Sequence, residues 1–147
     1  MGNTARNFFS RGEEKDIMMA IAKAELDTSG EIRVHIDKDC TGEVLDRAAS
    51  VFEKLGMVNT RERNGVLFYM AVKSHKFAII GDAGINSKVP GDFWDDIKSH
   101  MLIRFQEGTV AQGLIEGIGI AGKELKTHFP WQNNDENELP NEISFGQ

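Results

Sequence analysis

Asp82 stands between two glycines at the end of an apolar run, in the stretch IIGDAGI (79–85). An Asp in this setting is often a turn residue whose side chain accepts a hydrogen bond from its own backbone. The same carboxylate is also able to bind a metal ion or to exchange protons in catalysis. Which of the three roles applies depends on the oxygen donors that the fold brings beside it.

Other oxygen donors are expected close to Asp82 because of the way its strand should pair. An antiparallel strand ends where its neighbours begin, so Asp82 should share one edge of a sheet with Glu31 and Asn64, which stand at the starts of two other strands. A helix that begins after Pro90 adds acids near this edge. Hard cations bind such sets of carboxylate, amide and carbonyl oxygens. The predicted ligands of Ca2+ or Mg2+ are Asp82, Glu31, Asn64, Asp95 and Asp96.

Each predicted ligand also has a structural explanation. Asp82 fits a turn, and Glu31 fits the solvated start of a strand. Acids in the first turn of a helix, among them Asp92, are favoured by the helix dipole. No EF-hand calcium loop is present. Carboxylates clustered without a cation would repel one another and raise at least one pKa.

The chain carries no other recognisable catalytic pattern. Its histidines have no zinc-ligand spacing, and no base is predicted beside the single cysteine, Cys40. The stretch from Gly81 to Gly84 lacks the glycine pattern and the lysine of phosphate-binding loops, and no nucleophile elbow exists. The residues therefore favour a cation site over these alternatives.

The composition is that of one globular domain. The chain has 147 residues, 40% of them hydrophobic, and a formal net charge of -6 without a basic stripe, so nucleic-acid binding is not expected. No stretch reaches the length of a membrane span, and the N-terminus lacks the apolar core of a signal peptide. We predict a soluble, cytoplasmic monomer.

Hydrophobic periodicity predicts the elements that position the site. Residues 65–72, GVLFYMAV, are apolar on both faces and indicate a central strand, whereas 31–37 alternate and indicate a half-buried one. A short polar loop then leads into 77–82, which favours an antiparallel hairpin. Capping-box spacing marks helix starts at Ser10 and Thr109. Helices are expected at about 12–27, at 43–55, from Pro90 to Gly108, and from Thr109 onward.

The order α-β-α-β-β-α-α predicts an α/β single-domain sandwich. Its mixed sheet combines a parallel β-α-β unit with an antiparallel hairpin, and helices cover both faces. Because an interior helix glycine costs about 0.5–1 kcal/mol against alanine, Gly113 or Gly117 in the last helix should sit in a close backbone contact. We divide the chain into an N-terminal extension (1–9), the domain (10–130) and an acidic tail (131–147).

Four stretches, in this order along the chain, resemble the TPM domain: SGEIRVHI, RNGVLFYMAV, KFAIIGDAGI, and GLIEGIGIAGKEL followed by FP. The resemblance covers residues 10–130. That family includes a thylakoid-lumen phosphatase involved in photosystem II repair and an auxiliary protein of nematode receptors. The resemblance implies an α/β sandwich, divalent-cation binding in some members and acid phosphatase activity in the thylakoid member.

The resemblance also bears on single residues. Glu31 corresponds to the glutamate that opens the family's first strand, Asn64 to the Asn-Gly before the second, and Asp82 to the loop after the third. The chain departs from the family in having Arg63 where Asp often precedes that Asn-Gly, and a cation pointing inward there would weaken a metal site. It also lacks the signal peptide that members usually have.

Two functions follow as hypotheses. The first is a module that binds a divalent cation and acts through an unidentified partner protein. The alternative is a weak metal-assisted acid phosphatase, a phosphomonoesterase in which a cation at Asp82 polarises the phosphoryl oxygen. Because no nucleophile, base and phosphate clamp can be placed together, we favour the binding module and assign no catalytic residue.

Overall fold

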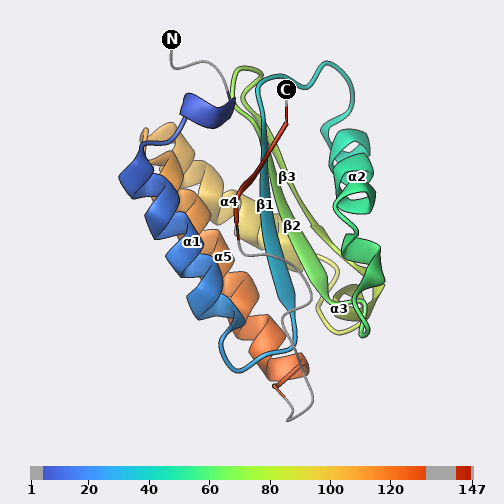
Figure 1. Cartoon of the computed structure of the whole chain (residues 1–147). Helices are drawn as coiled ribbons and strands as arrows, with labels where there is room; N and C mark the ends of the chain where they lie inside the picture. Colours follow the sequence, from blue (N-terminus) through green and yellow to red (C-terminus); the bar gives the residue numbers. More distant parts are fainter. Residues whose placement is uncertain (1–4, 132–141, 147) are drawn as a thin grey trace.

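The computed structural model describes residues 5–131 and 142–146, and its centre is a four-stranded sheet of order β3-β2-β1-β4 (Figure 1). The strands are β1 (Glu31–Asp37), β2 (Gly65–Ala71), β3 (Lys76–Gly81) and β4 (Ser144–Phe145). β1 and β2 are parallel, and β2 and β3 are antiparallel, which confirms the predicted mixed sheet. β4 was not predicted; it pairs in parallel with the outer edge of β1.

Helices cover both faces of the sheet, as predicted (Figure 1). One face carries α1 (Arg11–Glu25), α4 (Phe93–Gln106) and α5 (Val110–His128). The other face carries α2 (Val44–Lys54). The short elements are η1 (Ala5–Asn7), η2 (Met57–Asn59) and α3 (Ala83–Asn86). Within the part of the chain that the structure describes, no helix has the length and apolarity that crossing a membrane requires.

Local sequence signals explain most helix ends. Ser10 and Glu13 form the reciprocal capping box that the sequence predicts. α2 is followed by Gly56, whose φ of 73° is left-handed and favours glycine. The capping box predicted at Thr109 is absent: its hydroxyl donates instead to the carbonyl of Arg104, which tightens the connection between α4 and α5.

β2 is the central strand that its sequence predicts. Leu67, Phe68, Tyr69 and Met70 are all buried, so neither face of the strand meets water. Phe68 belongs to the larger hydrophobic cluster under α1, α4 and α5, and Leu67 and Tyr69 belong to a second cluster under α2. The predicted topology is therefore confirmed at its centre.

β1 differs from the prediction, because all seven of its residues are buried rather than half of them. Its alternating polar residues are covered from two directions. β4 pairs along the outer edge of the strand, and Arg47 reaches from α2 to Asp37. The polar face of β1 is therefore an interior surface that holds charged groups.

The described ends of the chain pack on the body. Phe9, within the predicted N-terminal extension, is buried in the main hydrophobic cluster. In the predicted tail, Ile143 is buried, Phe145 lies under the guanidinium of Arg6, and Trp131 is 45% exposed. Leu139, a further apolar residue of the predicted tail, lies outside the described residues.

Candidate functional site

Strand register brings the three strand-end residues to one edge of the sheet, as the sequence predicts. Glu31 pairs with Gly65, and the Glu31 N–H donates to the carbonyl of Asn64 at 3.4 Å. On the other side of β2, the Asp82 N–H donates to the carbonyl of Gly65 at 2.9 Å. The backbones of Glu31, Asn64 and Asp82 therefore line up along this edge.

The carboxylate of Asp82 binds the guanidinium of Arg63. Arg63 Nε donates to Oδ2 at 2.7 Å and Nη2 donates to Oδ1 at 2.8 Å, the strong bidentate geometry of an Arg–carboxylate pair. Oδ1 also accepts from the Ala83 N–H at 2.8 Å, so Asp82 caps α3. The Asp82 side chain is 7% exposed and that of Arg63 is 50% exposed. Arg63 thus holds the position on Asp82 that a bound cation would take.

The glycines beside Asp82 have packing roles. A Cβ on Gly84 would overlap the backbone carbonyls of Glu62 and Arg63, and the Gly84 N–H donates to the Arg63 carbonyl at 2.8 Å. Gly81 lies against the Trp94 ring. The glycines therefore let α3 and α4 pack closely on this edge, and Asp82 combines a capping role with the ion pair.

Of the acids near the start of α4, Asp95 lies apart from this edge. Asp92, Asp95 and Asp96 are exposed, and Asp95 lines a hollow beside His75 and Phe77, at the start of β3, whereas Asp82 follows its end. Over residues 5–131 and 142–146, no three His, Cys, Asp or Glu side chains are grouped in a way that would hold a metal ion. A cation at the Glu31 end of the sheet would need neutral oxygens as further ligands.

A pair of glutamates lies at the start of β1. Glu25, at the end of α1, and Glu31 line a cavity of about 180 Å³ together with Ser29. The Ile32 N–H donates to Glu25 Oε2 at 2.7 Å. Burial raises the pKa of Glu25 from 4.5 to about 8; the charge and hydrogen bond of Glu31 add to the rise, and the Ile32 hydrogen bond opposes it. A pKa raised to about 8 favours a protonated Glu25 beside Glu31 at neutral pH.

Asn64 adds a buried side-chain amide at this edge. The side chain is buried, and among the described residues its Oδ1 has no hydrogen-bond partner. Its Nδ2 donates to Ser29 Oγ at 3.1 Å, and the Ser29 hydroxyl donates to Glu62 Oε2 at 2.6 Å. Because Ser29 lines the same cavity as the glutamates, the edge collects carboxyl, hydroxyl and amide oxygens.

Sequence reasoning missed Glu25, although its position carries a signal. An acid in the last turn of a helix is disfavoured by the negative end of the helix dipole. Glu25 is the last residue of α1. The connection to β1 is only five residues long and ends at Gly30. A short connection of this kind folds the last helical turn back onto the first residues of the strand, which is how Glu25 meets Glu31.

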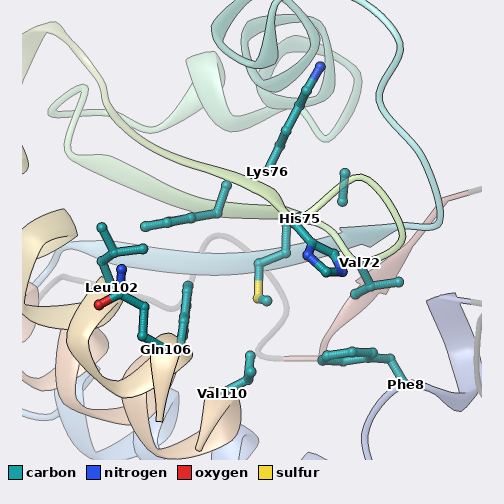
Figure 2. A pocket seen from close by; sticks show the side chains of 11 residues that line it. Phe8, Val72, His75, Lys76, Leu102, Gln106 and Val110 are labelled. Carbon is teal, nitrogen blue, oxygen red and sulfur yellow. The ribbon is translucent and has the colours of Figure 1, made fainter. Parts of the chain in front are cut away.

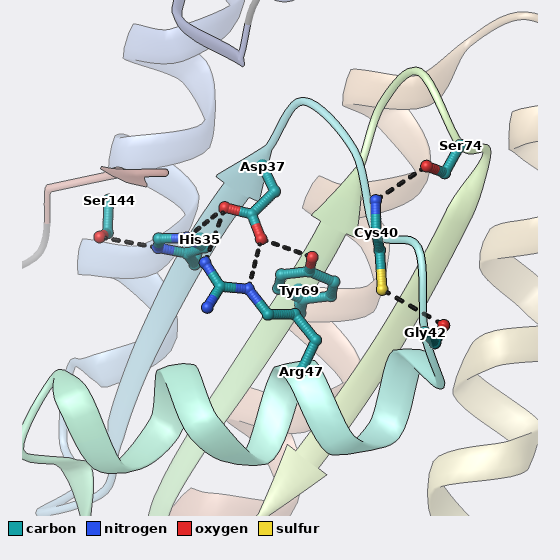
Figure 3. Close-up of polar contacts among 8 residues, drawn as sticks. All are labelled: His35, Asp37, Cys40, Gly42, Arg47, Tyr69, Ser74 and Ser144. Atoms are coloured by element: carbon teal, nitrogen blue, oxygen red, sulfur yellow. Dashed lines mark hydrogen bonds and ion pairs between the residues drawn. The ribbon is translucent and has the colours of Figure 1, made fainter. Parts of the chain in front are cut away.

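A second polar cluster lies at the opposite end of β1, around the buried carboxylate of Asp37 (Figure 3). Asp37 accepts from Arg47 Nε at 2.8 Å and from the Tyr69 hydroxyl at 2.6 Å. His35 Nε2 lies 3.0 Å from Asp37 Oδ1, and its Nδ1 lies 2.9 Å from the hydroxyl of Ser144. The cluster joins β1, β2, α2 and β4.

The charge states in this cluster follow from burial and hydrogen bonding. Burial alone would raise the pKa of Asp37, but donors on Arg47, Tyr69 and His35 outweigh it, so the pKa is lowered and the group is a carboxylate. Burial lowers the pKa of His35 despite the attraction of Asp37. A neutral His35 then donates from Nε2 to Asp37 and accepts the Ser144 hydroxyl at Nδ1. Asp37 is fully satisfied, so the cluster is a structural node.

An apolar cavity of about 360 Å³ lies between the β2–β3 hairpin and the helices α4 and α5 (Figure 2). Phe77 and Phe105 meet edge to face in its wall, with ring centroids 4.8 Å apart. Lys76 lines the cavity but its Nζ donates to the carbonyls of Cys40 and Gly42. The cavity lies at the Ala71 end of β2, away from Glu31, and plays no part in the candidate cation site.

Comparisons with known proteins agree with this fold. The sequence model of the TPM domain matches residues 3–124. The NMR structure of the BA42 protein from the psychrophilic bacterium Bizionia argentinensis is 49% identical, with a TM-score of 0.87, and the match covers 95% of this chain and 96% of that one. None of the curated proteins matches.

More distant structures share the fold alone. The N-terminal domain of a P. gingivalis protein is 18% identical with a TM-score of 0.69, covering 85% of this chain and 83% of that one. The N-terminal domain of the Corynebacterium glutamicum protein cg2496 is 11% identical with a TM-score of 0.64, covering 88% and 84%. The fold is a mixed sheet between two helical layers, and one family model matches most of the length of the chain. The chain belongs to the TPM-domain family.

Proposed function

We propose that this TPM domain binds a divalent cation, Ca2+ or Mg2+, at the edge where β1 and β2 begin. The observation that carries the proposal is the carboxyl pair of half-buried Glu25 and buried Glu31, with the pKa of Glu25 raised to about 8. Two carboxyl groups held together in a protein interior are stabilised by a shared proton or by a cation. The proton and the cation therefore compete for the same oxygens.

The oxygen donors at this edge suit a hard cation that protein groups coordinate only in part. Glu25 and Glu31 supply carboxylates, and Asn64 supplies a buried amide oxygen that has no partner among the described residues. Ca2+ accepts such mixed sets with carbonyl groups and water, and Mg2+ usually keeps several waters. Asp82 joins the site only when Arg63, which is half exposed, swings away from its carboxylate.

A binding role fits the site better than catalysis. Within the described ranges, no nucleophile, general base and phosphate clamp come together at this edge, and phosphoryl transfer requires that set. A module that binds a cation and acts through a protein partner requires none of these groups. We therefore place the domain among accessory modules and keep acid phosphatase activity as the alternative.

The test is a calcium titration followed by thermal melting and by NMR amide shifts. Ligand that binds only the folded state adds about 2.7 kcal/mol at a hundredfold excess over Kd. Millimolar Ca2+ should raise the melting temperature and shift the amides of Glu31 and Asn64. Glu31→Gln should lose most of the rise, and Asp95→Asn, which changes an exposed acid of α4, should keep it.

The outcomes separate the hypotheses. An equal calcium response in Glu31→Gln and wild type would remove the site from this edge. Release of phosphate from a chromogenic phosphomonoester, lost on chelation and in Asp82→Asn, would replace the binding module with the phosphatase. Absence of any calcium or magnesium response would reject both cation hypotheses.

A further inference from the structure

The outer face of α5 forms the floor of a groove that α1 and α4 flank. The groove has a volume of about 590 Å³. Ile115, Gly119 and Ile120 of α5 lie on its floor, and Ala20 of α1 and His100 of α4 lie in its walls. Figure 1 shows α1 and α5 side by side in the helical layer that covers one face of the sheet. None of the lining residues belongs to the proposed cation site.

Gly119 is the glycine of α5 that the fold does not explain. A Cβ on Gly113 would meet Arg104 and Phe105, one on Gly117 would meet Met101, and one on Gly122 would meet Ala24. A Cβ on Gly119 would meet no atom of the described residues within 4 Å. Since an interior helix glycine costs about 0.5–1 kcal/mol against alanine, open space above this one points to close approach by a group from outside the domain.

The charge of the groove is opposite to that of the whole protein. The chain carries a net charge of -6. The groove is lined by Lys23, Lys123 and Lys126, none of which forms an ion pair with another described residue, and by Arg104. Glu116 is the one acid among the described lining residues, and it is already bound by Arg104 at 3.0 Å and His100 at 2.7 Å.

Apolar side chains beside the groove add to this surface. Met19, next to Ala20, is 60% exposed, and Ile103, next to Arg104, is 59% exposed. A concave apolar floor with unpaired lysines on its rim is complementary to a ligand that is apolar on one side and acidic on its flanks. From Glu116 to Lys126 the floor extends roughly 15 Å at 1.5 Å per residue, which is about three helical turns.

We propose that this groove, hereafter the α5 groove, binds an acidic amphipathic helix of a partner protein. A helix satisfies its own backbone, and the groove offers side chains only, because its walls are helices whose backbone groups are already paired. An extended peptide would need a free strand edge.

The probe for the test is a synthetic helical peptide of five turns, with Ala and Leu along one face and Glu on both flanks. A control peptide carries Lys in place of every Glu. NMR titration of the full chain should show the acidic peptide shifting the amides of Gly119 and Lys123, with no shift from the lysine peptide. Binding of both peptides with equal affinity, or no shift at Gly119 up to millimolar peptide, would overturn the proposal.

Two matched double variants test the charge. Lys23→Glu with Lys123→Glu should weaken the acidic peptide at least tenfold. Lys54→Glu with Lys73→Glu makes the same change in net charge at exposed lysines outside the groove and should leave the affinity within twofold. Equal losses of peptide affinity in both double variants would show that net charge alone causes the effect. The groove would then be rejected as the binding site.

A substitution at Gly119 distinguishes an effect on peptide binding from an effect on folding. Gly119→Ala should raise the melting temperature of the domain, because its Cβ meets no atom and alanine favours a helix, yet it should weaken the peptide severalfold. A gain of stability with unchanged peptide affinity would show that nothing approaches this glycine. Shifts at Gly119 caused by anionic vesicles or by raised concentration of the protein itself, without a peptide response, would assign the groove to a membrane or to a second copy.

Discussion

Glu25 shows how one residue links protonation to cation binding. Its carboxyl is part-buried against Glu31, and burial raises its pKa to about 8. Between the usual pKa of 4.5 and this folded value, the folded protein holds a proton that the unfolded chain has released. Stability therefore falls as pH rises through this window, and the deprotonated pair above it is the form that would bind the proposed cation.

We predict that Glu25→Gln removes this pH dependence. The amide cannot ionise, so the free energy of unfolding should change less between pH 5 and pH 8.5 than in wild type. The calcium-induced rise in melting temperature should be larger at pH 8.5 than at pH 6 in wild type only. Glu53→Gln, at an exposed acid of α2, is the control. A wild type whose calcium response is independent of pH would contradict the competition between proton and cation.

Arg63 decides whether Asp82 is a ligand. It has a φ of 53°, and Asn tolerates this left-handed backbone, so Arg63→Asn removes the guanidinium with little backbone strain. Without cation the melting temperature should fall, although solvent screens the half-exposed guanidinium. Calcium should then restore more stability than it adds to wild type, as followed by thermal melting.

A second substitution, combined with the first, tests Asp82 directly. Asp82→Asn in the Arg63→Asn background keeps a side-chain acceptor for the Ala83 N–H and removes the charge. It should abolish the extra calcium response. If Arg63→Asn responds to calcium no more than wild type does, Asp82 is a cap and an ion-pair partner only.

At the scale of elements, periodicity and caps were sufficient for the main helices and for β1 to β3. The capping box at Ser10 and the two-sided apolar run of β2 each depend on neighbouring residues, which a sequence displays directly. β4 and α3 could not be predicted this way. β4 has two residues and depends on the distant edge of β1, and α3 is one turn held by Asp82 and the Arg63 carbonyl.

The same contrast applies to the site. Strand register could be predicted, so the meeting of Glu31, Asn64 and Asp82 along one edge was foreseen. The direction of a side chain could not be predicted from the sequence. The hydrogen bond from Arg63 to Asp82 depends on the left-handed backbone of Arg63 in the loop before β2. Glu25 reaches Glu31 through the short connection from α1 to β1, so its place in the last turn of the helix was a local signal that pointed to it.

The glycines of α5 give a prediction for this element. The close contacts predicted for Gly113 and Gly117 are confirmed, with a Cβ on Gly117 falling 2.6 Å from Met101 Sδ and 3.2 Å from Phe68. Overpacking of a core costs about 1–3 kcal/mol, more than the helix-propensity gain of about 0.5–1 kcal/mol. Gly117→Ala should therefore lower stability by about 1 kcal/mol in urea denaturation. A rise in its melting temperature like that expected of Gly119→Ala would end the close-packing explanation.

At the scale of the whole molecule, the two ends of β1 hold opposite kinds of polar site. At one end Glu25 and Glu31 form a carboxyl pair with an excess of acid and a neighbouring amide oxygen that is unpaired among the described residues. At the other end Asp37 is satisfied by three donors. The first end is where we propose that a cation binds, and the second joins β4 and α2 to the sheet.

This division predicts what removal of the C-terminal strand does. Deletion of residues 142–147 takes away the bond between Ser144 and His35, the bond from the Gly146 N–H to the Ile36 carbonyl at 2.8 Å, and the buried side chain of Ile143. One buried aliphatic side chain and two hydrogen bonds together amount to about 3 kcal/mol. The deletion also leaves β1 as an unpaired edge, which favours association through strand pairing.

We therefore expect the deleted protein to unfold at lower urea and to sediment as a mixture of monomer and larger species at high concentration. A variant in which a Gly-Ser segment of equal length replaces residues 142–147 controls for chain length. The calcium response should survive in both, because Glu31 and Asn64 lie at the far end of β1 and β2. Unchanged stability with an unchanged sedimentation profile would show that β4 does not close the sheet.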